Sequence, residues 1–250
     1  ALQKAIPGME WESLGNAPET IRRIKDEQEL RYIEEACDIS CKAFDRLLPF
    51  IKPGVTEKEL QLKLDFLLQE MGGEALAFNT IVASGVNGSL PHAIPSDKKV
   101  ETGEMITFDF GAKKGGYCAD MTRTVALGQP SPEMKKIYDT VLLAQETCEG
   151  MLAPGKVCRE IDAEARRIID GAGYAGRFGH GLGHSVGIDI HEEPRLSQVC
   201  NDLLEVNQTI TVEPGIYVPG LGGVRIENTC AITESGGRTL VHAQKALLIL

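Results

Sequence analysis

The sequence predicts an α+β fold made of two similar halves, each with mostly antiparallel strands flanked by helices. The first observation is that one order of elements (helix, Pro-Gly turn, helix, strands) occurs twice along the 250 residues. Pro53-Gly54 and Pro154-Gly155 align at an offset of 101 residues (154 − 53), and Gly72 aligns with Gly173 at the same offset. The second observation is that each half contains a hairpin pattern with two acidic residues. A repeat of domain size favours two halves about a pseudo-twofold axis over a solenoid.

The first half is expected to begin after a lead-in or linker over residues 1–25, which contains scattered Pro and Gly and has no clear period. Asp26 and Glu29 have the spacing of a helix N-cap, and apolar residues then recur at helical spacing as far as Pro49. The ordered domain is therefore predicted to span 26–250.

The remaining elements follow from caps and turn residues. Thr56–Glu59 is a capping box that opens a second helix, and strands are expected at about 80–83 and 105–127. In the second half, Ser131–Glu133 begins one helix, a second is expected over about 158–170, and strands follow.

Composition limits the classes of partner. A formal net charge of −10 argues against nucleic acid or an anionic membrane, and no apolar run approaches the ~20 residues of a membrane span. Seven cysteines without a CxxC pair or a secretory leader predict reduced thiols in a cytoplasmic protein. Cys37 and Cys41 lie one helical turn apart, but no second Cys or His pair complements them as a metal site.

The first acidic hairpin lies in "ITFDFGAKKGGYCADMTRT", residues 106–124. Asp109 and Asp120 have their midpoint between Lys114 and Gly115, so a two- or four-residue loop centred there would place them directly opposite each other. Their Cβ atoms would then lie about 4.5–5.5 Å apart on one face. Phe108, Phe110, Met121 and Val125 would point to the other face, into the core.

The second half repeats this arrangement in "TITVEPGIYVPGLGGVRIENTCAI". Glu213 and Glu227 have their midpoint at Gly220, inside a turn-forming segment, so a loop of odd length pairs them. Arg225 shares their face by the period-two alternation of a strand.

One such pair could belong to a solvated outer face. Two pairs at corresponding places in a duplicated chain, set among apolar residues, favour neutralisation by cations, because like charges directly opposite are destabilising. Two divalent ions would cancel the charge of four carboxylates.

Four histidines cluster around the same segments. His92 precedes the first hairpin, and "FGHGLGHSVGIDIHEEP" places His180, His184 and His191 before the second. Carboxylates with one imidazole suit Mn²⁺, Co²⁺, Fe²⁺ or Zn²⁺. Two such ions activate water and polarise a carbonyl, and the other histidines could donate hydrogen bonds to the substrate.

Several motifs resemble one known family. "IVASGVNGSLPH", "DFGAKKGGYCADMTRT", "GHGLGHSVGIDIHEEP" and "EPGIYVPGLGGVRIEN" closely resemble the pita-bread metallopeptidases, in particular the Xaa-Pro peptidases aminopeptidase P and prolidase. The resemblance covers roughly residues 20–250. It implies a pita-bread catalytic domain with a curved, mostly antiparallel sheet.

The resemblance also implies roles for individual residues. The ligands of two divalent ions, manganese first, would be Asp109, Asp120, His184, Glu213 and Glu227. His92 and His191 would contact the substrate, and His180, Tyr217 and Arg225 would support the pocket, with Arg225 orienting a carboxylate ligand. Water would attack the carbonyl before a proline, and Glu213 would relay a proton to the leaving nitrogen.

Three features depart from the family pattern. Ser185-Val186 follows the ligand histidine where Gly is commoner, and Gly88-Ser89 stands where "SA" is usual. The N-terminal domain that usually precedes such a catalytic domain is not part of this sequence, which leaves the oligomeric state open, a homodimer being one alternative.

The favoured interpretation is a metal-dependent Xaa-Pro aminopeptidase. The alternatives are an Xaa-Pro dipeptidase (prolidase), a methionine aminopeptidase and a non-catalytic peptide-binding module. "GLGGVRIEN" and "SLPH" favour the proline-specific branch, and a non-catalytic module would have lost ligand residues.

Overall fold

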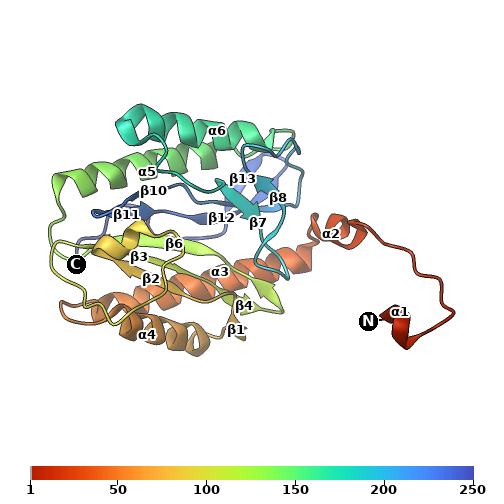
Figure 1. Cartoon of the computed structure of the whole chain (residues 1–250), viewed down its shortest axis with the longest axis horizontal. Coiled ribbons are helices and arrows are strands. Elements are labelled where there is room, and N and C mark those ends of the chain that lie inside the picture. Colours follow the sequence, from red (N-terminus) through yellow and green to blue (C-terminus); the bar gives the residue numbers. More distant parts are fainter. Residues whose placement is uncertain (1) are drawn as a thin grey trace.

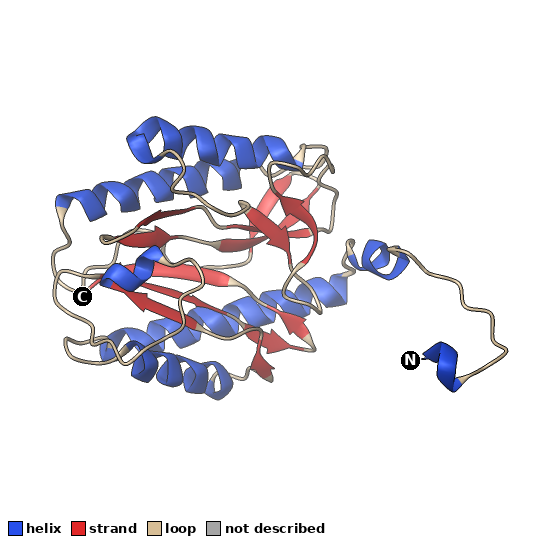
Figure 2. Ribbon diagram, in the orientation of Figure 1, coloured by secondary structure: helices blue, strands red, loops and turns tan. Residues whose placement is uncertain are grey.

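The computed structural model describes residues 2–250, with side chains from Lys4 onward, so Ala1 of the predicted lead-in lies outside the described residues. Helices and antiparallel strand pairs form the body of the molecule, which confirms the predicted α+β class. Two helices lie on each side of the strands, α3 and α4 on one side and α5 and α6 on the other (Figures 1 and 2).

The first half begins at the predicted caps. The Asp26 side chain accepts from the backbone of Glu29 while Glu29 reaches back, and Thr56 and Glu59 form the same reciprocal box. The elements of this half are α3 (Glu27–Leu47), η1 (Leu48–Phe50), α4 (Glu57–Glu70), β1 (Ala75–Leu76), β2 (Ile81–Ser84), η2 (Gly85–Ser89), β3 (Met105–Phe110), β4 (Ala112–Lys114), β5 (Tyr117–Cys118) and β6 (Met121–Ala126).

The second half opens with α5, whose N-cap Ser131 accepts from the backbone N–H of Met134. Its elements are α5 (Pro132–Gly150), α6 (Cys158–Ile169), η3 (Asp170–Tyr174), β7 (Gly183–Ser185), β8 (Glu192–Leu196), β9 (Thr209–Val212), β10 (Gly215–Val218), β11 (Gly222–Arg225), β12 (Asn228–Thr233) and β13 (Gly236–Thr239). The predicted order of helix, turn, helix and strands therefore occurs in both halves.

Hydrogen bonds around the two Pro-Gly turns repeat as well. The backbone N–H of Gly54 donates to the carbonyl of Val100 at 2.8 Å, and that of Gly155 donates to Leu204 at 2.8 Å. The residue before α4 and the residue before α6 each form an isolated antiparallel bridge to the segment just upstream of the acidic hairpin of their half. The predicted internal duplication is thus visible in the backbone contacts as well as in the element order.

The strands pair in small antiparallel groups between the helices. The two central groups are β2-β3-β6 in the first half and β13-β12-β9 in the second, and β10 pairs with β11. One apolar cluster packs mainly beneath α3 and α4 and a second beneath α5 and α6. Each helix pair therefore buries one side of its own strands, and the other side is left facing the opposite half.

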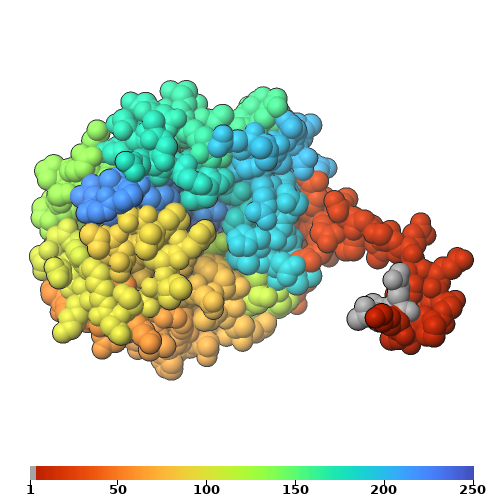
Figure 3. All heavy atoms as spheres, viewed as in Figure 1, coloured from red at the N-terminus to blue at the C-terminus, as the bar shows by residue number. Residues whose placement is uncertain are grey.

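The N-terminal segment differs from the rest of the chain. It contains two short helices, α1 (Leu2–Ala5) and α2 (Ala17–Arg22), and the part before α2 stands away from the body (Figures 1 and 3). The last residues of the predicted lead-in contact the body: Arg23 pairs with Asp202 at 2.6 Å, and Lys25 is buried.

Two predictions from composition can be compared with the structure. Each of the seven cysteines, all of them within the described residues, is a free thiol, and Cys37 and Cys41 are buried. Among residues 2–250, no helix combines the length and the apolar character needed to cross a membrane.

Candidate active site

The register of the first acidic hairpin differs from the prediction. Asp109 lies opposite Thr122 in the β3–β6 ladder, so it does not directly face Asp120. The reason is the turn: Gly115 and Gly116 have φ of +56° and +83°, the left-handed values that a two-residue hairpin turn requires at both central positions. The turn is therefore centred one residue later than predicted.

This error leaves the faces of the strands unchanged. Moving the turn centre by one residue shifts each cross-strand partner by two residues, and a shift of two preserves the face. Thr107 and Thr124 share a hydrogen bond of 2.9 Å on the face that carries the acids. The four apolar side chains predicted for the other face are buried in the first core cluster: Phe108, Phe110, Met121 and Val125.

The register of the second hairpin agrees with the prediction. Val212 pairs with Asn228, and Gly215 pairs with Arg225, so the register on both sides places Glu213 opposite Glu227. The connecting loop covers the three residues between Val218 and Gly222.

The two halves meet along β6 and the segment around Glu227. The backbone N–H of Glu227 donates to the carbonyl of Thr122 at 3.1 Å, and the Thr229 hydroxyl donates to the carbonyl of Asp120 at 2.7 Å. These bonds hold the acidic faces of both hairpins against each other. Acids separated by more than 100 positions in sequence therefore share one site.

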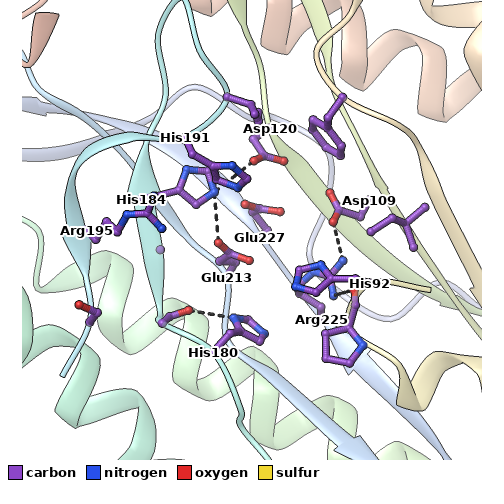
Figure 4. A pocket seen from close by; sticks show the side chains of 17 residues that line it. His92, Asp109, Asp120, His180, His184, His191, Arg195, Glu213, Arg225 and Glu227 are labelled. Carbon is purple, nitrogen blue, oxygen red and sulfur yellow. Dashed lines mark hydrogen bonds and ion pairs between the residues drawn. The ribbon is translucent and has the colours of Figure 1, made fainter. Parts of the chain in front are cut away.

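A cavity of about 440 Å³ opens at this junction. Figure 4 shows the carboxylates of Asp120, Glu213 and Glu227 directed toward a common centre, with Asp109 on the opposite side beside Arg225. Of the sequence-predicted site residues, nine line the cavity: His92, Asp109, Asp120, His180, His184, His191, Glu213, Arg225 and Glu227. The tenth, Tyr217, contacts Arg225 and His180 from behind.

His184 is presented to the acids by strand β7. A Cβ on Gly183 would lie 1.9 Å from the Thr211 carbonyl oxygen, so only glycine allows β7 to approach β9 this closely. The Nδ1 of His184 lies 3.0 Å from the Ser185 carbonyl and must be the protonated nitrogen, because a carbonyl only accepts. Its Nε2 then directs a lone pair at oxygens of Asp120, 3.5 Å away, and Glu213, 3.4 Å away.

Burial dominates the electrostatics of this cluster. It raises the pKa of Asp120 and Glu213 well above the usual range, and neighbouring carboxylates, Glu227 first, raise both further. The pKa of Glu227 rises to about 8 through burial and the charge of Asp109. Burial lowers the pKa of His184 to about 3, so its imidazole is neutral at pH 7. Its contacts with the carboxylates are therefore not ion pairs.

Arg225 connects Asp109 to the rest of the site. Its Nη2 donates to Asp109 Oδ2 at 2.6 Å, and its Nε donates to the Thr122 hydroxyl at 3.0 Å. That hydroxyl in turn donates to Glu227 Oε2 at 2.7 Å. A single guanidinium thus orients one acid directly and a second one through a threonine.

A further chain of hydrogen bonds runs from Arg225 to His180. Arg225 Nη1 donates to the Tyr217 hydroxyl at 3.0 Å, and His180 Nε2 lies 2.8 Å from that same oxygen. Burial, followed by the charge of Arg225, lowers the pKa of His180 to about 4. His180 is therefore neutral at pH 7 and accepts the tyrosine proton at Nε2, while its Nδ1 donates to the Gly181 carbonyl at 2.9 Å.

The donor atoms present fit divalent cations. One oxygen each of Asp109 and Glu227, Oδ1 and Oε1, is buried without a hydrogen-bond partner among the described residues. Ligand atoms of Asp120, His184 and Glu227 all lie within 4.8 Å of one another. Unpartnered buried carboxylate oxygens and a lone pair facing carboxylates repel one another unless a cation or a proton lies between them. Oxygen donors with one imidazole suit first-row divalent metals.

Several residues that line the cavity were not predicted from the sequence. They are Phe78, Ile81, Ile190, Arg195 and Ser197. Arg195 directly follows the "HEEP" motif, and its place four residues after His191 is the signal that could have indicated it. In the structure it lies near the end of β8. The apolar members give no such signal, because isolated Phe and Ile residues look the same in a core and in a pocket.

Comparison with known proteins identifies relatives over nearly the whole chain. Residues 31–234 match the model of metallopeptidase family M24. The Xaa-Pro dipeptidase of Pyrococcus furiosus is 41% identical over 239 residues, covering 96% of this chain and 69% of that protein. The structure of an Xaa-Pro dipeptidase from Bacillus anthracis has a TM-score of 0.96 at 42% identity, covering 99% of this chain and 70% of that one. An X-Pro aminopeptidase from Thermotoga maritima has a TM-score of 0.96 at 38% identity, covering 100% and 71%.

Fold and site together define a metal-dependent exopeptidase with the pita-bread fold, as the resemblance implied. The chain belongs to metallopeptidase family M24. Metal dependence comes with the family, and the cluster of Asp120, His184 and Glu227 is the corresponding feature of this chain.

Proposed function

We propose that this chain is an Xaa-Pro dipeptidase, which hydrolyses the bond between an N-terminal residue and a following proline. The observation that carries the proposal is the convergence of four acids and His184 from both halves on one cavity. The choice of substrate is supported by the dipeptidases among the relatives. The Xaa-Pro aminopeptidase favoured by sequence analysis is not confirmed, and its dipeptidase alternative fits the relatives better, although an X-Pro aminopeptidase is also a structural neighbour.

Five side chains are proposed to hold two divalent ions: Asp109, Asp120, His184, Glu213 and Glu227. When bound, such ions would supply positive charge that polarises the scissile carbonyl and lowers the pKa of water. Manganese is our first candidate, with Co²⁺, Fe²⁺ and Zn²⁺ as alternatives, because oxygen donors predominate. Arg225 is proposed to keep Asp109 in place through its 2.6 Å ion pair.

Three residues are proposed to act on the substrate. His92 from the first half and His191 from the second half both line the cavity. They would donate hydrogen bonds to the substrate carbonyl as charge develops on its oxygen. Glu213 would move the proton. It would take a proton from the attacking water and pass it to the leaving imino nitrogen.

Arg195 provides a reason to expect dipeptides. Its guanidinium lines a cavity whose other charged groups include four carboxylates, and its side chain is 51% exposed with Glu193 as a partner at 3.2 Å. In a dipeptide the free carboxylate directly follows the proline ring, and a guanidinium can bind a carboxylate through two parallel hydrogen bonds. A longer peptide has an uncharged amide at that position.

The test is hydrolysis by chelated and Mn²⁺-loaded protein on Xaa-Pro, Xaa-Pro-Yaa and Met-Ala-Ser peptides of matched concentration. We expect cleavage of the Xaa-Pro dipeptide after loading and at least tenfold lower kcat/KM on the Xaa-Pro-Yaa peptide. Equal or faster cleavage of Xaa-Pro-Yaa would favour an aminopeptidase, and cleavage of Met-Ala-Ser alone would favour a methionine aminopeptidase. Metal binding without cleavage of any peptide would favour a non-catalytic module. We assign the catalytic unit to residues 26–250, together with Arg22, Arg23 and Lys25, whose side chains contact it.

A further inference from the structure

Two active-site histidines lie on one short hairpin. His184 is in β7 and His191 directly precedes β8, and their rings lie 4.4 Å apart at 71°. The residues that directly follow these histidines, Ser185 and Glu192, are cross-strand partners. The register shifts between His184 and Ser185, so the strand ladder alone does not fix the hairpin at this point.

One buried lysine contacts both members of that pair. Lys25 lies between α2 and α3 and is 1% exposed. Its ammonium donates to the Ser185 hydroxyl at 3.0 Å and to Glu192 Oε2 at 3.1 Å. Its backbone N–H donates to the Asn207 carbonyl at 2.9 Å, which ties this part of the chain to the turn before β9.

A second cation supports the same carboxylate. Arg22 pairs with Glu192 Oε1 and, at 2.7 Å, with Asp189. Glu192 thus has one oxygen on Lys25 and the other on Arg22. The hairpin is therefore held from outside by two cations of the N-terminal segment, and neither of them lies within the 31–234 range that matches the family.

We propose that Lys25 is a positioning residue for the metal site and the substrate site, acting through Ser185 on His184 and through Glu192 on His191. Three donors on one ammonium can bridge the two strands where their ladder is irregular. A glycine at position 185 would have no hydroxyl to accept from Lys25. The serine therefore gives this chain a contact that a glycine at that position could not make.

Loss of the Lys25 ammonium is expected to be destabilising. Removing one partner of a buried, hydrogen-bonded charge leaves the other group buried and unpaired, which is more costly than the interaction itself is favourable. Without Lys25, Ser185 loses a donor, and Glu192 keeps only the partners on its other side. The hairpin is then free to shift, and residues that orient metal ligands typically change metal affinity or activity about 10–100-fold when they are lost.

The test compares two lysine-to-methionine variants, since methionine keeps most of the side-chain volume. Lys25→Met removes the clamp, and Lys245→Met is the control, because Lys245 makes a similar pair of contacts with Gln145 at 2.8 Å and Glu149 at 3.3 Å. We expect Lys25→Met to weaken Mn²⁺ binding to the chelated protein at least tenfold by calorimetry and to lower kcat on Xaa-Pro at least tenfold. Lys245→Met should stay within about twofold of the parent in both.

A second variant covers the case in which Lys25→Met does not fold. Ser185→Ala removes only the hydroxyl, and we expect it to weaken Mn²⁺ binding about threefold or more and to shift the His184 ring signals in NMR spectra of the metal-free protein. If Lys25→Met does fold, the double variant should lose less than the product of the single effects, because both remove the same contact.

The inference rests on the proposed function, and the measurements separate the two. Parent protein that binds no metal and cleaves no peptide would contradict the proposed function. Parent protein that binds metal and cleaves Xaa-Pro, together with Lys25→Met and Ser185→Ala variants that have parent-like metal affinity, parent-like kcat and unshifted histidine signals, would overturn the role of Lys25 alone. A lower melting temperature without these changes would make Lys25 a purely structural residue.

Discussion

The metal-free protein should lose stability as the pH rises from about 6.5 to 8. Without cations, the buried acids of the site are more stable protonated than charged, and burial raises the pKa of Glu227 to about 8 and those of Asp120 and Glu213 in the same direction. In the unfolded chain a glutamate titrates near 4.3. Between these two values the folded state binds more protons than the unfolded state, so stability falls as pH rises.

The histidines limit the window in which this effect is visible. Burial lowers the pKa of His184 to about 3 and of His180 to about 4, so below about pH 6.5 the unfolded state binds extra protons at these positions. Their contribution rises with pH and opposes that of the acids. At pH 6.5 an unfolded histidine is still about half protonated, so this opposing contribution fades only toward pH 7.5. The acids outweigh it because three of them have raised pKa values. Burial also raises the pKa of six cysteines, which adds a fall in stability of the same sign toward pH 8.

The magnitude follows from the number of retained protons. Each one contributes about 1.4 kcal/mol per pH unit, so one proton kept between pH 6.5 and 8 corresponds to about 2 kcal/mol. For a chain of this size that is a fall of about 4–8 °C in melting temperature.

Thermal unfolding of chelated protein at pH 6.5, 7, 7.5 and 8 measures this fall directly. Glu227→Gln should flatten the slope, because the amide does not titrate. Addition of Mn²⁺ should raise the melting temperature more at pH 8 than at pH 6.5, since the metal replaces protons that are already leaving. A melting temperature of the chelated protein that stays level or rises over this range would refute the reasoning.

Three further predictions concern single side chains. Arg225→Met leaves Asp109 without its 2.6 Å partner, so it should lower the free energy of unfolding by about 3–5 kcal/mol in urea titration and the affinity for Mn²⁺ at least tenfold. The control, Arg238→Met, removes the exposed pair with Glu34 and should lower the free energy of unfolding by less than about 1 kcal/mol. Similar losses for both variants would contradict the role of Arg225. Arg195→Met should raise KM for Xaa-Pro about tenfold or more with little change for Xaa-Pro-Yaa, and an equal loss on both substrates would exclude carboxylate binding. Gly115→Ala and Gly116→Ala should each lower the free energy of unfolding by about 1–2 kcal/mol, because φ is positive at both positions. Gly115→Ala should lower it more, since its Cβ would lie 2.5 Å from the Tyr32 ring, whereas a Cβ at Gly116 meets nothing within 4 Å. The reverse order in urea titration would contradict the turn geometry.

Features set by neighbouring residues were predictable from the sequence. The capping boxes at Asp26 and Thr56 and the cap at Ser131 fix helix starts through groups only three residues away. The second hairpin was predicted in register because Pro219-Gly220 marks its turn unambiguously. The duplication and the convergence of acids followed from these local signals, because each half repeats them.

The misplaced first hairpin has an equally physical origin. "KKGG" offers two neighbouring turn centres, and only the pair Gly115-Gly116 satisfies a positive φ at both positions. The prediction still placed the acids on the correct face, because a period of two tolerates a shift of two residues. Side-chain faces are therefore more robust to such an error than are exact cross-strand partners.

Contacts between residues far apart in the sequence could not be predicted, for a different reason. Lys25 and Ser185 are separated by 160 positions, and nothing in the residues around either one indicates the other. The lead-in was assigned to residues 1–25 because its composition lacks a period, yet its final residues pack against the hairpin that carries two histidines. A single buried charge is enough to make such a segment part of the site, because an ammonium without solvent must find its partners wherever the fold brings them.

The site needs both halves because only their packing buries the acids. Either hairpin alone would place its acids on an open strand face, where water screens them and no pKa shift follows. Packing one acidic face on the other excludes water, which raises the cost of every unneutralised carboxylate and at the same time strengthens its attraction for a cation. Burying these acids therefore lowers the stability of the metal-free protein and raises its affinity for metal. In the described chain, both effects arise at the junction between the two duplicated halves.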